Sequence, residues 1–170
     1  MNTAETCAAA MVVIACVSDV TSSRIPNAIT FAGAVLALAF HALAASGSGA
    51  PHAAAGFVAG LATLFPIFAL GAMGAGDVKL MAATGAWLGW KAILFVALYA
   101  SLAGGVLAII VALHSGYLAT ALRNVRSLVT YWWVSGVRPL PALTLESRNS
   151  ARLPYALAIA GGLAVTLWRR

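Results

Sequence analysis

The sequence predicts an all-α protein, a polytopic membrane helical bundle with about six transmembrane helices, since one crossing takes about 20 residues. Its 170 residues are 62% hydrophobic and only 8% charged, and their mean hydropathy is +0.96. Soluble domains are about 45–50% apolar and about one quarter charged. The composition excludes a cytosolic enzyme, a disordered chain, a secreted disulfide scaffold and an ordinary nucleic-acid-binding domain. Residues 1–170 are therefore expected to form a single membrane-embedded domain.

Six apolar stretches are the candidates for these helices. They are Ala4–Asp19, Ala28–Ala45, Ala53–Gly71, Asp77–Trp90, Ala92–Leu113 and Leu153–Trp168. The fourth stretch is short, at roughly 21 Å for about 14 residues, so it either lies in a thinned bilayer or bends into the fifth at residues 89–91. Two glycine pairs, Gly56 with Gly60 and Gly85 with Gly89, are expected to let helices pack closely.

The longest polar connection, residues 114–152, is predicted to lie in the cytoplasm. Seven of the ten basic residues lie in or beside the connections after the first, third and fifth stretches, so the positive-inside rule places both termini outside. The seven are Arg24, Lys79, Arg123, Arg126, Arg138, Arg148 and Arg152. Over residues 117–133, apolar side chains recur at helical spacing, with Arg123 and Arg126 off the apolar stripe. This predicts an amphipathic helix on the cytoplasmic membrane surface; the alternative is an extension of the fifth span.

Two aspartates stand out among the four acidic residues. Asp19 ends the first apolar stretch, and Asp77 begins the fourth. Because the second and third stretches cross the membrane and return, both carboxyl groups are expected at the same depth near the same membrane face. Ionisable side chains at the edge of the hydrocarbon are costly and are candidates for function.

Two neighbouring carboxyl groups can act on one water as general acid and general base. They cannot both ionise easily at short range, so the pair shares a proton, as in aspartic proteases. The alternative is a structural role at helix ends: Asp77 lies where an N-cap belongs, although Asp19 at a helix C-terminus opposes the helix dipole. Gly74 and Gly76 favour the functional interpretation, because they permit unusual backbone angles and the close approach of a substrate strand.

The segments around both aspartates resemble those of the type IV prepilin leader peptidases, which are membrane aspartic proteases with a GxGD motif. Asp19 is followed by Ile-Pro-Asn at residues 25–27, and residues 74–79 read Gly-Ala-Gly-Asp-Val-Lys, which matches GxGDxK. Residues 152–160 look like the proline-containing start of the family's final helix. The resemblance follows the order of all the spans.

This resemblance implies an intramembrane endopeptidase that cleaves the leader from prepilin-like precursors in the bacterial inner membrane, with Asp19 and Asp77 as its catalytic pair. The cut would follow a glycine at the cytoplasmic end of the precursor's hydrophobic helix. The matched motifs also imply residues that shape the site, which are Gly74, Gly76, Pro26 and Asn27. The residues implied to contact substrate or lipid are Lys79, Arg24, Pro154 and Tyr155.

The larger members of that family carry an insert with paired CxxC motifs and also methylate the new pilin N-terminus. Cys7 and Cys16 form no such motif and are expected to be small packing residues. The chain thus resembles the short class that serves Flp/Tad-type pili, without N-methyltransferase activity. His41, His52 and His114 are scattered, so no metal or other cofactor is expected.

Two other classes of function stay open from the residues alone. A small proton-coupled transporter also needs intramembrane carboxylates, but usually near the midplane and in broken helices of a repeat. A structural subunit of a pilus or secretion machine would need no such pair. The expected partners are a prepilin-like protein and membrane lipids, not nucleic acid, and the residues indicate no oligomeric state.

Overall fold

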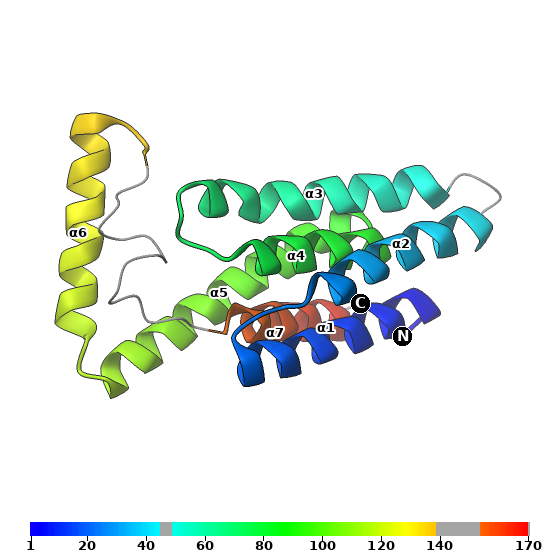
Figure 1. Ribbon diagram of the computed structural model, residues 1–170, viewed down its shortest axis with the longest axis horizontal. Helices are drawn as coiled ribbons and strands as arrows, with labels where there is room; N and C mark the ends of the chain where they lie inside the picture. The colour runs from blue at the N-terminus through cyan, green and yellow to red at the C-terminus, as the bar shows by residue number, and fades with distance from the viewer. Residues whose placement is uncertain (45–48, 139–153, 170) are drawn as a thin grey trace.

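The computed structural model describes residues 1–44, 49–138 and 154–169, and within them the chain folds into seven α-helices (Figure 1). The helices are α1 (Thr3–Ser22), α2 (Asn27–Ala44), α3 (Gly49–Ala69), α4 (Ala75–Leu88), α5 (Trp90–His114), α6 (Leu118–Ser135) and α7 (Tyr155–Trp168). The predicted all-α fold is confirmed, and each predicted apolar stretch forms a helix. The expected ends of two stretches, Ala45 and Leu153, lie outside the described residues, as do Arg148 and Arg152.

Four helices in the described part of the chain are long and apolar enough to cross a membrane. These are α1, α2, α3 and α5, with 18 to 25 residues and mean hydropathies from 1.6 to 2.5. The other two predicted crossings, α4 and α7, have only 14 residues each. Such a helix is about 21 Å long, shorter than the roughly 30 Å of the hydrocarbon core.

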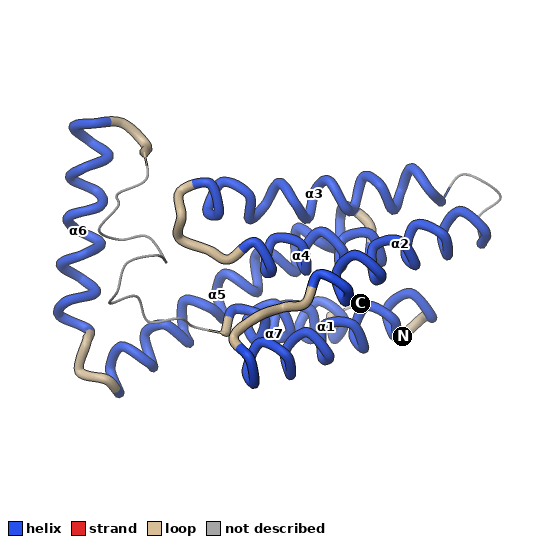
Figure 2. The backbone as a smooth tube through the Cα atoms, viewed as in Figure 1, coloured by secondary structure: helices blue, strands red, loops and turns tan. Residues whose placement is uncertain are grey.

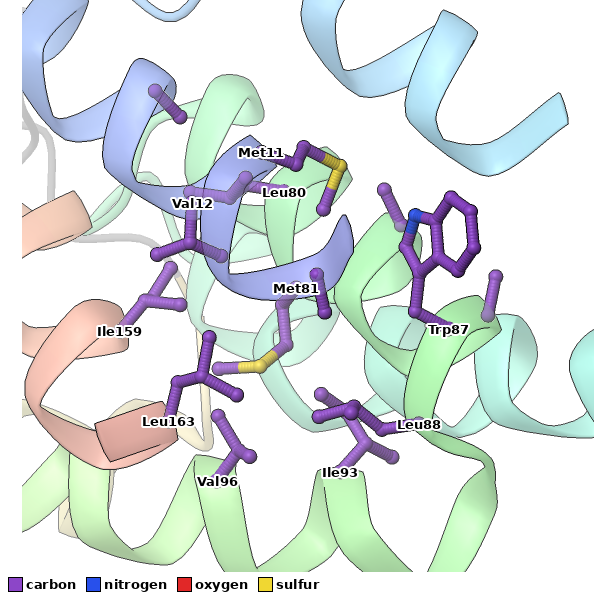
Figure 3. Packing of buried hydrophobic residues seen from close by; sticks show 14 of the residues in the cluster. Met11, Val12, Leu80, Met81, Trp87, Leu88, Ile93, Val96, Ile159 and Leu163 are labelled. Atoms are coloured by element: carbon purple, nitrogen blue, oxygen red, sulfur yellow. The ribbon is translucent and has the colours of Figure 1, made fainter. Parts of the chain in front are cut away.

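Helix α4 occupies the centre of the bundle. It contacts α1, α2, α3, α5 and α7, and residues 80–88 are buried without interruption. Figure 3 shows its Leu80, Met81 and Trp87 among side chains from α1, α5 and α7. A helix that is apolar on all sides is stable only where other elements surround it. In lipid, this packing stabilises the bundle through van der Waals contact rather than through removal of apolar surface from water.

The packing of α3 on α4 depends on glycine. A Cβ atom on Gly56 would collide with the carbonyl oxygen of Gly85, and one on Gly60 would collide with the backbone of α4. The expectation that these glycines serve helix packing is confirmed. Gly89 has a further role, because its φ of +81° is left-handed and a Cβ added to it would collide with the imidazole of His52.

Neither α4 nor α5 extends into the next helix. Gly89 separates α4 from α5, which runs back along the bundle (Figure 2). At the far end of α5, a short turn with the left-handed Gly116 (φ +66°) leads into α6. In Figure 1, α6 lies across the direction of the other helices, and none of its residues is buried. A separate helix after the fifth stretch is thus confirmed, whereas its location on the membrane surface stays a prediction.

Candidate active site

Three helix ends meet at one end of the bundle. The C-terminus of α1 and the N-termini of α4 and α7 lie there, together with the loops 23–26 and 70–74 (Figure 1). Asp19 lies in the last turn of α1, Asp77 in the first turn of α4, and Tyr155 is the first residue of α7. Both aspartates are therefore at the same end of the bundle, where the count of membrane crossings predicts them.

Asp19 is held between α1 and α7. The N–H of Ala156, in the first turn of α7, donates to Oδ2 of Asp19 at 3.4 Å, across a separation of 137 residues in the chain. The α1 helix ends at Ser22, and its C-cap residue Ser23 has a left-handed φ of 51° and donates its N–H to the Asp19 carbonyl at 2.8 Å. A carboxylate at the C-terminus of its own helix opposes that dipole, but the N-terminus of α7 supplies the opposite, favourable field.

Asp77 is not the N-cap residue of α4, so its expected position at the helix start is wrong, whereas a structural role there stays open. The N-cap is Gly74, in an extended conformation, and the helix begins at Ala75. Asp77 is the third helical residue, and its carboxylate accepts a hydrogen bond from the N–H of Gly74. The helix thus begins two residues before the expected start at Asp77. Because glycine has no side chain that could cap the helix, the Asp77 carboxylate reaches back from the first turn to the N-cap N–H.

The two carboxyl groups interact. The charge of Asp19 acts on the Asp77 carboxyl, so the pair lies within electrostatic range although the two residues belong to different helices. Both side chains are half-buried. Two interacting carboxyl groups can act on one water as general acid and general base.

Tyr155 reaches the same group of side chains. Its hydroxyl is hydrogen-bonded to the hydroxyl of Ser101 in α5, and the charge of Asp77 acts on it. Its ring lies over Gly104, where an added Cβ would stand 2.9 Å from the ring carbon Cε2. Pro154 directly precedes the helix as its N-cap residue, which agrees with the predicted proline-led start of this segment.

The loop after α1 packs on the start of α4. A Cβ added to Gly76 would lie 3.1 Å from Cβ of Ile25, tighter than an ordinary carbon contact, so glycine favours this close approach of the loop. The carbonyl of Arg24 accepts a hydrogen bond from the Ser18 hydroxyl at 2.9 Å, which ties the loop back to α1. Gly76 therefore accommodates the chain's own loop, whereas the sequence suggested room for a substrate strand.

The remaining predicted site residues lie around this loop. Lys79 donates to Oδ1 of Asn27 at 2.9 Å and so connects the N-terminal ends of α4 and α2. Pro26 accepts a hydrogen bond from the Ile29 N–H at 3.1 Å at the start of α2. The side chain of Arg24 is exposed. The structure thus joins Lys79 to a residue that was expected only to shape the loop.

Sequence reasoning missed three contributors to this end of the bundle. Ser101 and Gly104 position the Tyr155 ring and hydroxyl from α5. Cys16, expected to be a packing residue, is buried and also donates its Sγ hydrogen to the Ala156 carbonyl at 3.0 Å. Ser101, the one serine or threonine in the apolar fifth stretch, was the available signal, because the partners of these residues lie far away in the chain.

Across the described residues, no group of three His, Cys, Asp or Glu side chains is arranged to hold a metal ion. No curated protein and no solved structure matches the chain. The profile of the type IV leader peptidase family matches residues 6–109, which contain both aspartates but end before α6 and α7. That match covers more than half of the chain. The protein therefore belongs to the type IV leader peptidase family, aspartic peptidases of the bacterial inner membrane that process prepilins.

Proposed function

We propose that this protein is an intramembrane aspartic endopeptidase that removes the leader of prepilin-like precursors at the cytoplasmic membrane face. One observation supports this proposal most strongly. Asp19 and Asp77 come from different helices and interact at one end of the bundle. The basic residues of the neighbouring connections favour the cytoplasmic side for this end, with both termini outside.

The reaction uses the single proton of the pair. The ionised carboxylate takes a proton from a water molecule while the water oxygen attacks the scissile carbonyl carbon. The protonated carboxyl donates its proton to the developing oxyanion. When the tetrahedral intermediate collapses, the carbon–nitrogen bond breaks, and the carboxyl that took the water proton gives it to the leaving amine. The other carboxylate takes a proton from a hydroxyl of the intermediate as the new carbonyl forms. The pair again holds one proton, so it is ready for the next substrate.

The depth of the site suits this substrate class. The aspartates lie at helix ends, where the first turn of a precursor's hydrophobic helix would meet the cytoplasm. The proposed cleavage site follows a glycine just before that helix. The extended backbone of the precursor at this site would therefore lie at the carboxyl pair. With Cys7 and Cys16 as its two cysteines and no CxxC motif, the chain fits the short Flp/Tad-type class without N-methyltransferase activity.

A cell-free cleavage assay with a pilin precursor tests this proposal. Asp19→Asn and Asp77→Asn, made separately, are each expected to lower kcat/KM by about 100-fold or more, the size of a general acid–base contribution. Glu5→Gln is the matched control. It makes the same acid-to-amide change at the other end of α1, and glutamine can replace glutamate in the capping box with Asn2.

The outcomes separate the three classes of function. Cleavage that survives either aspartate substitution, in a protein that still inserts and melts cooperatively, rules out the carboxyl pair as the catalyst. A transporter would lose proton-coupled flux while the precursor was still processed. A structural subunit would tolerate both substitutions.

A further inference from the structure

A cleft lies at the end of the α5–α7 pair that is opposite the aspartates. Its volume is about 300 Å³, and it opens between the N-terminal half of α5 and the C-terminal end of α7. The residues that line it are Lys91, Ala92, Phe95, Tyr99, Thr166 and Arg169. The proposed cleavage reaction uses none of them.

The cleft combines two cations with an apolar wall. Lys91, Phe95 and Tyr99 are spaced by four residues and therefore share one face of α5, with Arg169 of α7 facing them. Among the described residues the lining contains no carboxylate. Positive charge next to exposed aromatic and aliphatic surface is complementary to a ligand with an anionic head and an apolar tail.

Arg169 is held in place to receive an anion. Its Nη1 donates to the hydroxyl of Tyr99, and its guanidinium carbon lies 6.0 Å from the centre of that ring. The guanidinium has five N–H donors in a planar fork that fits phosphate oxygens. The hydrogen bond to Tyr99 therefore orients the guanidinium and leaves other N–H donors of the planar fork for phosphate oxygens.

Aromatic residues mark this end of the bundle as the level of lipid headgroups. Trp90 is 45% exposed and Trp168 is 92% exposed. The ammonium group of Lys91 lies 5.5 Å from the Trp90 ring centre. Exposed tryptophans beside cations are typical of the membrane–water interface. Phe95, which is 54% exposed, lies one turn further from that interface, beside the hydrocarbon.

We infer that this cleft binds one anionic phospholipid, with its phosphate between Lys91 and Arg169 and an acyl chain along Phe95. The apolar wall and the position at headgroup level favour a lipid over free phosphate as the source of the anion. The site lies away from the carboxyl pair, so the inference does not depend on the proposed peptidase activity.

Native mass spectrometry of the purified full-length protein, with added phosphatidylglycerol or phosphatidylcholine, tests the inference. The wild type is expected to retain one phosphatidylglycerol in clear preference to phosphatidylcholine. Each of Lys91→Gln and Arg169→Gln should lower this preference about fivefold, and the double variant about 30-fold, since one basic residue near an anionic surface contributes about 1 kcal/mol. Tyr99→Phe keeps the charge and should still weaken retention, because it removes the hydroxyl that orients Arg169.

The matched control removes two charges elsewhere. Arg123→Gln with Arg126→Gln, on the exposed α6, should leave the retained lipid in place. Equal losses in the control and in the cleft variant would show a general charge effect and overturn the site. Equal retention of both lipids, or stabilisation against heat by inorganic phosphate as large as that by phosphatidylglycerol, would overturn it as well. Thermal melts of every variant without lipid verify that the protein is folded.

Discussion

Replacing Gly76 by alanine tests how closely the loop after α1 must approach α4. The new methyl carbon would lie 3.1 Å from Cβ of Ile25, whereas carbon atoms in favourable contact are about 3.5–4.0 Å apart. The loop must therefore move by a few tenths of an ångström. Ile25 is two residues beyond Ser23, whose N–H is hydrogen-bonded to the Asp19 carbonyl. A shift of the loop therefore displaces the end of α1 that carries the carboxylate.

This displacement should affect cleavage far more than stability. A misplacement of about 1 Å can cost about 100-fold in rate, so for a shift of a few tenths of an ångström we expect kcat/KM for a pilin precursor to fall severalfold. Alanine has a better helix propensity than glycine by up to about 1 kcal/mol, which offsets part of the strain. The melting temperature in detergent should thus change by only a few degrees.

Gly105→Ala is the matched control for this experiment. It makes the same substitution within a helix, at a position where an added Cβ meets nothing within 4 Å. Its cleavage rate should equal that of the wild type. If Gly76→Ala cleaves as fast as Gly105→Ala, the contact between the loop and α4 does not set the position of Asp19, and the reasoning is refuted.

Three further predictions concern the bundle and the site. Tyr155→Phe removes the hydroxyl bonded to α5 and should lower kcat/KM severalfold, whereas Tyr131→Phe on α6 should not. Equal cleavage rates of the two variants would show that Tyr155 is not part of the site. Gly60→Val forces α3 away from α4 and should lower the free energy of unfolding by about 1–3 kcal/mol. The measurement is the melting temperature, which should fall less in the control Gly105→Val. Cleavage needs one ionised and one protonated carboxyl. The value of kcat/KM should therefore fall at low pH, as both become protonated, and at high pH, as both ionise. A pH profile that lacks one of these two decreases contradicts a shared proton.

The class of fold was predictable because its determinants are local. Apolar composition and stretch length decide which segments form membrane helices, and the amphipathic spacing over residues 117–133 indicated the separate helix α6. The central place of α4 was not predictable. Its 14 residues look like a short crossing in sequence, and only the surrounding helices show why they are apolar on every side.

Part of the candidate site also followed from the chain alone. Counting the crossings between Asp19 and Asp77 places them at one membrane face, whichever face that is. The rest depends on contacts between distant segments: Ala156 donates to Asp19 across 137 residues, and Lys79 donates to Asn27 across 52. No local pattern encodes such pairs, because the partner is chosen by how the helices pack.

Hydropathy, length and two short motifs by themselves determined that this protein is a helical membrane bundle with two acids at one face. Tertiary structure decided which groups surround those acids and which cations share the cleft at the opposite end. The physical reason is the range of the interactions. Helix formation and membrane partition depend on neighbouring residues, whereas the polar surroundings of a side chain depend on helices that meet only after the chain has folded.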